Sequence, residues 1–107
     1  MTDAVTNDAF LRGKLANFVE YLKSILQKRM QNTRYAEFAK KIEELQNVEI
    51  SLFIVHVVEN MVPYKSNVAA YVDKLLAEND VKSSELSADE LTKLGRYIAC
   101  FIDVVQS

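Results

Sequence analysis

The sequence contains few residues that break or cross-link a chain: one proline, two glycines and one cysteine among 107 residues. An all-β fold needs many tight turns, so this scarcity of proline and glycine favours helices joined by a few breaks. The single cysteine, Cys100, excludes an internal disulfide and is typical of a protein from a reducing compartment. We therefore expect a helical protein located in the cytoplasm.

Long hydrophobic runs are also absent. The longest unbroken apolar run is the six residues 97–102, whereas a transmembrane helix requires about 20. The N-terminal residues MTDAVTNDAF contain no apolar core of the kind that a secretory signal has. We expect no membrane partner and no secretory signal.

Patterns typical of catalysis or metal binding are missing as well. His56 is the only histidine, and Glu59 could give it one neighbouring ligand but not a complete metal site. We interpret His56 as a hydrogen-bonded residue at the polar margin of a helix, and Cys100 as a small buried hydrophobe rather than a nucleophile. Because G-x-S-x-G, P-loop and H-E-x-x-H motifs are absent, the expectation is a non-enzyme with no cofactor and no metal.

What the chain does contain is one strongly apolar stretch, residues 48–62 (VEISLFIVHVVENMV). Alternation over residues 48–52 and many β-branched side chains favour a strand. The length of the stretch, Asn47 as a candidate N-cap and Pro63 at its end favour a helix. No second segment could pair with a lone strand, so we predict a buried helix at the centre of the core.

Four further helices are predicted from apolar residues spaced by three and four positions. They cover residues 7–31, 34–46, 66–79 and 87 onward, with Thr33, Ser66 and Ser87 as candidate N-caps and residues 79–86 as a loop. Ser87 followed by Glu90 has the capping-box pattern. Gly95 lies on the apolar side of the last helix. We interpret it as a point of close contact with a crossing helix rather than as a glycine that the helix merely tolerates.

The predicted fold class is therefore all-α. Half of the residues are hydrophobic and 26% are charged, which is ordinary for a single folded domain of this length. We predict one helical domain over residues 7–107, a bundle of about five helices around the buried helix 48–62. Residues 1–6 are expected to form a frayed N-terminal tail.

Part of the chain resembles the repressor-type helix-turn-helix. FAKKI at residues 38–42, ISLFIVHVVEN at 50–60, Pro63 and the following VAAYVDKLL repeat its general layout. The resemblance implies DNA binding through residues 50–60. However, that segment consists of Ile, Val, Leu and Phe, whereas base readout requires Arg, Gln, Asn or Ser. We therefore expect this element to form core instead, and assign no family.

Charge is distributed unevenly along the chain. Residues 12–41 carry eight basic and two acidic side chains, a local charge of +6, and residues 73–90 carry six acidic and two basic ones, a local charge of −4. A candidate partner-binding basic patch consists of Lys28, Arg29, Arg34, Tyr35, Lys40 and Lys41. Such a patch could contact phosphates, or it could be solvated helix surface.

The sequence thus favours a small non-catalytic helical interaction module, a regulator or accessory subunit. Its partner would be another protein, including a second copy of itself, because the apolar arc on helix 48–62 spans about 200° and exceeds what one neighbour covers. The alternative is a nucleic-acid-associated protein that uses the basic surface of residues 12–41.

Overall fold

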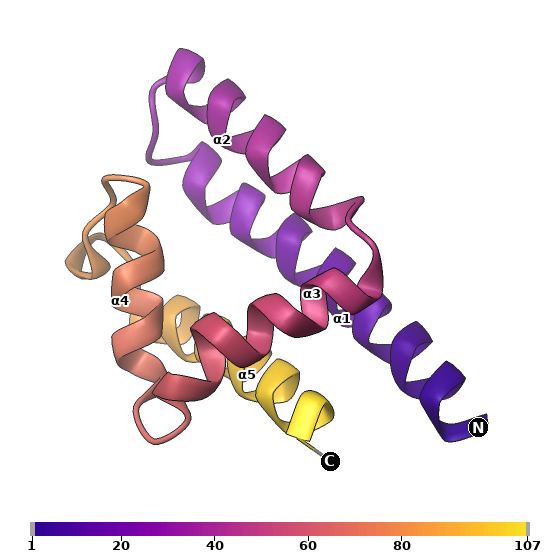
Figure 1. The fold of residues 1–107 in the computed structure, drawn as a ribbon. Helices are drawn as coiled ribbons and strands as arrows, with labels where there is room; N and C mark the ends of the chain where they lie inside the picture. The colour runs from indigo at the N-terminus through magenta and orange to yellow at the C-terminus, as the bar shows by residue number, and fades with distance from the viewer. Residues whose placement is uncertain (1, 107) are drawn as a thin grey trace.

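The computed structural model describes residues 2–106, and the side chains within that range except those of residues 2–7 and 45. The described chain is an all-α bundle, as predicted (Figure 1). Its five α-helices are α1 (Thr2–Gln27), α2 (Asn32–Gln46), α3 (Ile50–His56), α4 (Val68–Glu78) and α5 (Ala88–Gln106). Three short turns complete it: the π-helical η1 (Val57–Met61) and the 3-10 turns η2 (Val62–Tyr64) and η3 (Ser83–Glu85).

The long helix α1 and the C-terminal helix α5 provide most of the core. Helices α1 and α2 form an antiparallel pair, and α5 packs on α1 (Figure 1). The buried positions of these two central helices are Leu11, Leu15, Phe18, Val19, Leu22, Ile25 and Leu26 on α1, and Leu94, Ile98, Phe101 and Ile102 on α5. Their spacing of three and four residues explains why each helix buries one stripe.

Phe101 joins three helices at the centre of this core. Its ring meets Phe18 of α1 at 5.5 Å and Phe53 of α3 at 5.3 Å between centroids, both at 89°. Edge-to-face pairs of this kind are favourable beyond the area they bury. The inner face of α3 is thereby fixed against α1 and α5.

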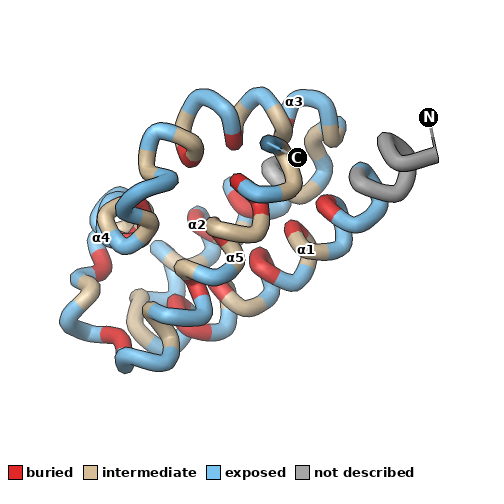
Figure 2. The backbone as a smooth tube through the Cα atoms, turned by 90° about the horizontal axis from the view of Figure 1, so that it is seen from below, coloured by how far each residue is buried: buried red, intermediate tan, exposed pale blue. Residues whose placement is uncertain are grey.

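The predicted helix in residues 48–62 is present, but it is buried on one face only. Phe53, Val57 and Met61 lie in the core, whereas Leu52, Val55 and Val58 are about half exposed. The helix crosses the edge of the bundle, where the core covers only its inner side (Figure 2). The centre of the core is therefore the α1–α5 contact rather than residues 48–62.

Several predicted boundaries moved by a few residues. Helix α3 is preceded by Glu49, without a side-chain cap, rather than by Asn47. Asn67 caps α4 in place of Ser66, since its side-chain oxygen accepts the Ala70 N–H at 3.3 Å. The α1 backbone begins at Thr2, and fraying of residues 1–6 stays a prediction.

Two local signals at the ends of α4 and α5 are well defined. The capping box of α5 is confirmed, because the Glu90 N–H donates to Ser87 Oγ at 3.2 Å and the Ser87 N–H donates to Glu90 Oε1 at 2.9 Å. Helix α4 ends in a Schellman motif, in which Val81 N–H donates to Leu76 O and Asp80 adopts a positive φ of 56°. The chain therefore turns sharply between α4 and η3.

Gly95 does lie against a crossing helix, although the contact does not require a glycine. A Cβ built at Gly95 would sit 3.7 Å from Cγ1 of Val68 on α4, an ordinary van der Waals distance. The close-contact interpretation is thus correct about the neighbour and wrong about the need for a missing side chain.

Candidate interaction surface

Arg29, one of the predicted patch residues, is a structural clamp. Its guanidinium donates to Ile25 O at 2.7 Å, to Glu85 O at 3.1 Å and to Glu90 Oε1 at 2.8 Å. These acceptors belong to the end of α1, to η3 and to the first turn of α5. One side chain therefore ties together three elements that are distant in sequence, and it is occupied in doing so.

Glu90 is the acidic half of this clamp. The backbone N–H of Ser87 lowers the pKa of the Glu90 carboxyl, and the Arg29 guanidinium lowers it further, against an opposing effect of burial. Both side chains of the Arg29–Glu90 pair are only 20% exposed. The carboxylate thus caps α5 and neutralises Arg29 at the same time.

Arg34 is also engaged by the acidic segment. It forms an ion pair with Asp80, the positive-φ residue that follows α4. Together with the Arg29 clamp, this pair holds the connection between α4 and α5 against the turn between α1 and α2. The basic and acidic stretches of the sequence therefore face each other within the fold, and part of each charge is compensated internally.

The remaining patch residues include two that lie near the arginines: Lys28 and Arg29 both act on Glu90, and Lys41 lines the same small pocket as Arg34. Lys28, Lys40 and Lys41 are exposed, and Tyr35 is half-buried with its ring 6.5 Å from that of Phe38. Of the six predicted residues, three lysines are thus left facing solvent. Phosphate contact by this surface stays a prediction; Arg29 is held by intramolecular acceptors, whereas Arg34 forms its ion pair at an exposed position.

The outer face of α3 and η1 carries the surplus of the apolar arc that the sequence predicted for residues 48–62. Leu52 is 57% exposed, Val55 50% and Val58 49%. They recur every three residues and so lie on the side of the helix opposite the core. Scattered exposed aliphatic residues need no explanation, but three on adjacent turns form a contiguous apolar stripe. We call Leu52, Val55 and Val58 the apolar stripe.

The π-helical turn η1 keeps this stripe on the outside. Phe53, Val57 and Met61 are buried at a spacing of four residues, a spacing that drifts by about 40° per step around an α-helix. The wider π turn, in which Val62 N–H donates to Val57 O, takes up this drift and returns Met61 to the buried face. Local widening of the helix therefore lets one side stay in the core while the other stays in solvent.

Asn60 and His56 stabilise the junction between α3 and η1. The side-chain amide of Asn60 donates to His56 O at 3.0 Å and lies 3.2 Å from His56 Nδ1. The His56 ring stacks on Phe53 at 6.2 Å, and burial lowers its pKa below 6.5. His56 thus sits at a helix margin with a hydrogen-bonding neighbour, as predicted.

The segment that contains the apolar stripe has acidic side chains of its own, and basic ones reach it from other helices. From residue 42 to residue 64 the chain contains Glu43, Glu44, Glu49 and Glu59 but no lysine or arginine. Glu49 stands immediately before α3 and Glu59 lies in η1, both exposed. The Arg12 guanidinium of α1 donates to Val48 O at 3.4 Å, beside Glu49, so the charge around the stripe is mixed.

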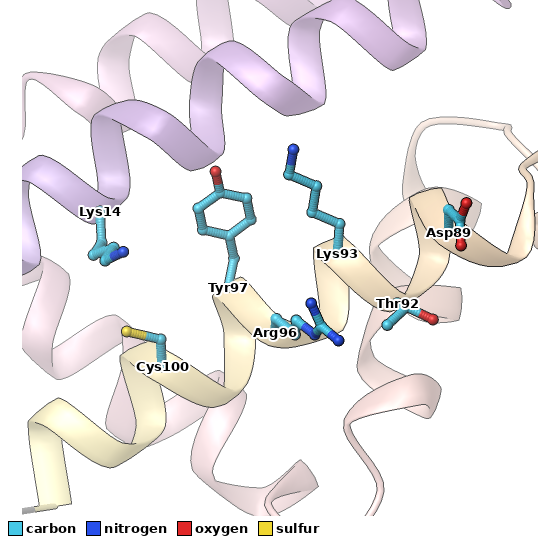
Figure 3. A pocket seen from close by; sticks show the side chains of 7 residues that line it. All are labelled: Lys14, Asp89, Thr92, Lys93, Arg96, Tyr97 and Cys100. Carbon is cyan, nitrogen blue, oxygen red and sulfur yellow. The ribbon is translucent and has the colours of Figure 1, made fainter.

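A concave region separate from the apolar stripe runs along α5 beside α1 (Figure 3). It is an open groove of about 520 Å³ lined by Lys14, Asp89, Thr92, Lys93, Arg96, Tyr97 and Cys100. Its lysines are occupied by aromatic rings, since Lys93 Nζ lies 4.7 Å from the centre of Tyr21 and Lys14 Nζ lies 5.5 Å from that of Phe10. The cations therefore do not converge on one point. Half-buried Cys100 lines this groove, so it is less buried than the small buried hydrophobe that was predicted.

Comparisons with known proteins identify no relative: no family model, no curated protein and no solved structure matches this chain. Among residues 2–106, no group of three or more His, Cys, Asp or Glu side chains is placed to hold a metal ion. No helix of the described part is both long and apolar enough to cross a bilayer. The large hydrophobic residues that the described part of the chain leaves exposed are the apolar stripe on α3 and η1 and, on α1, Phe10.

Proposed function

We propose that this protein is a small helical interaction module, a regulator or accessory subunit, and that the apolar stripe is its protein-binding surface. The observation that carries the proposal is the exposure of Leu52, Val55 and Val58 on one helix face. A monomeric protein gains nothing from three aliphatic side chains in water, whereas a helix-in-groove or helix-on-helix contact is built from such a row.

The size of the stripe sets the expected affinity contribution. Full burial of an aliphatic side chain is worth about 1.5–3 kcal/mol, so three half-exposed ones retain roughly 1 kcal/mol each, or about 3 kcal/mol together. That is a factor of roughly 150 in a dissociation constant. The stripe would therefore act as the anchor of a modest interface.

Site-specific photocrosslinking in the cells that produce the protein tests the proposal. A photoreactive amino acid at Val55 is expected to give one discrete adduct, whereas the same group at exposed Ser24 on α1 gives none. Replacing Leu52 and Val58 with Ser should abolish the Val55 adduct while the protein stays folded, because neither side chain belongs to the core. Equal crosslinking from positions 55 and 24 would argue against a dedicated surface.

A further inference from the structure

We infer that the groove between α1 and α5 binds an acidic peptide segment of another protein. This groove is the concave region of about 520 Å³ shown in Figure 3, on a surface separate from the apolar stripe. The inference follows from the juxtaposition of Lys14, Lys93 and Arg96 along one groove. It goes beyond the proposed function and does not depend on it.

The groove is basic in a chain that is acidic overall. Its lining contains three cations, Lys14, Lys93 and Arg96, and a single carboxylate, that of Asp89. Three positive charges minus one negative charge give the lining +2, whereas the whole chain carries −2. A concave surface of one sign concentrates ligands of the opposite sign. The groove therefore attracts anions, although the protein as a whole repels them.

The three cations are available to an external anion. Within the described part of the chain, the exposed Arg96 side chain has no hydrogen bond, ion pair or ring contact. The Lys14 ammonium lies 5.5 Å from the centre of the Phe10 ring, and the Lys93 ammonium lies 4.7 Å from that of Tyr21. A ring holds a cation in place without neutralising its charge. Both lysines are therefore positioned and still charged.

Nearby carboxylates bound the basic stretch rather than cancel it. Glu90 lies close enough to raise the pKa of Tyr21, but it is paired with Arg29 at 2.8 Å. Asp89 and the exposed Asp103 stand on α5 on either side of the cations, fourteen positions or about 21 Å apart. A matching segment is therefore acidic at its centre and uncharged at its ends.

The spacing of the cations selects an extended anion. Lys93 and Arg96 are one turn apart on α5, and Lys14 enters from α1 near Cys100, a further turn along (Figure 3). The distance along α5 from Lys93 to Cys100 is about 10 Å. One phosphate or carboxylate group cannot contact all three cations over that length, whereas successive acidic side chains of a peptide can.

The aromatic residues favour a peptide over a single-stranded nucleic acid. Such strands bind through rings on which successive bases stack. Here Lys93 covers Tyr21, and Tyr97 packs against Tyr21 with 6.2 Å between ring centres. The groove therefore has no row of free rings. Phe10, which is 48% exposed beside Lys14, offers an apolar contact to one end of a peptide instead.

Two fluorescent peptides of about ten residues, long enough to span the basic stretch, test the inference. Both have a leucine at each end; one has glutamates at its centre and the other has glutamines at the same positions. Fluorescence anisotropy measures their binding to the full chain. We expect the glutamate peptide to bind about tenfold more tightly and this advantage to shrink as salt is added.

Charge-neutralising variants identify the groove as the cause. In Lys93→Gln/Arg96→Gln, the two peptides should bind equally. Both side chains are exposed, so the fold should be retained. The matched control Lys65→Gln/Lys82→Gln removes two exposed lysines that do not line the groove, and the preference should remain. Circular dichroism confirms that each variant is folded.

Cys100 reports where the peptide binds, because it is the only thiol of the chain and lines the groove. The glutamate peptide should slow alkylation of Cys100 by iodoacetamide, which is uncharged, and the glutamine peptide at the same concentration should not. Tight binding of the glutamate peptide with unchanged alkylation would place it elsewhere and overturn the inference.

The remaining outcomes also decide against the inference. Equal binding of the two peptides, or equal loss in the two double variants, would remove the acidic partner. A single-stranded oligonucleotide of similar length that binds more tightly and displaces the glutamate peptide would assign the groove to nucleic acid. Self-association that Arg96→Glu abolishes would assign it to a second copy. None of these results affects the crosslink expected at Val55, so the proposed function is tested separately.

Discussion

Removal of the Arg29 side chain should destabilise the fold strongly, although the residue lies near the surface and was predicted to be part of a binding patch. Arg29→Ala deletes three hydrogen bonds, one of them to the Glu90 carboxylate at 2.8 Å. A hydrogen bond to a charged partner is worth about 1.5–3 kcal/mol and a neutral one about 1 kcal/mol. Because the Ile25 and Glu85 carbonyls can regain water, we expect a net loss of about 3 kcal/mol in the free energy of unfolding.

A double-mutant cycle isolates the pair. Arg29→Ala, Glu90→Gln and the double variant are unfolded in urea, and the coupling energy is expected to be about 1.5 kcal/mol, since both side chains are only 20% exposed. Arg29→Lys should recover less than half of the loss, because an ammonium cannot reach three acceptors in the fixed geometry of a guanidinium. The Arg29→Ala loss corresponds to a melting temperature lower by about 12 °C for a domain of this size.

Lys28→Ala is the control, because Lys28 is the exposed neighbour and should change stability by less than about 0.5 kcal/mol. The clamp is refuted if Arg29→Ala behaves like Lys28→Ala, or if the coupling energy is zero within error.

The role of Arg29 in stability also affects tests of nucleic-acid binding. Charge reversal at Arg29 would destabilise the fold, so a loss of binding in that variant would not show that Arg29 contacts nucleic acid. Lys28→Glu/Lys40→Glu/Lys41→Glu is the cleaner test of the basic surface in a filter-binding assay.

Three other predictions concern the helices themselves. Phe53→Ala should cost about 3–5 kcal/mol in urea unfolding, because the ring is 1% exposed, whereas Leu52→Ala should cost less than about 1 kcal/mol; similar losses would mean that α3 is rotated. Gly13→Ala should raise stability by about 1 kcal/mol, since no atom lies within 4 Å of the new Cβ; a thermal melt that falls would contradict it. Burial lowers the pKa of His56 from 6.5, so the unfolded chain takes up this proton first, and stability is full above pH 6.5 and declines as the pH falls through the folded pKa. His56→Gln should flatten that decline in a stability–pH profile, and an unchanged profile would exclude His56 as its source.

The candidate surface shows where sequence reasoning was sufficient and where it was not. The apolar arc of residues 48–62 indicated that one neighbour would not cover it, and the exposed apolar stripe agrees with that surplus. Local signals could not say which side chains would be left outside. That choice depends on the π turn η1, which adjusts the helical phase, and on the position of α3 at the edge of the bundle.

The basic patch stays a prediction, but two of its arginines have intramolecular partners that a local reading could not identify. Arg29 and Arg34 are close in sequence to Lys28, but their partners Glu90 and Asp80 lie 61 and 46 residues further along the chain. A local count of charges contains no information about which opposite charge the fold brings near. The local count of charges therefore overestimated the positive charge that is available to an external ligand.

The sequence by itself determined the helical class, the approximate segments and the Ser87–Glu90 capping box, because hydrophobic periodicity and capping depend on residues within one or two turns of each other. Only the tertiary structure decided that α1 and α5 form the centre, that Phe101 joins three helices, and that Leu52, Val55 and Val58 face water. Those features depend on how whole helices cross, and that arrangement is fixed by packing between residues far apart in the chain.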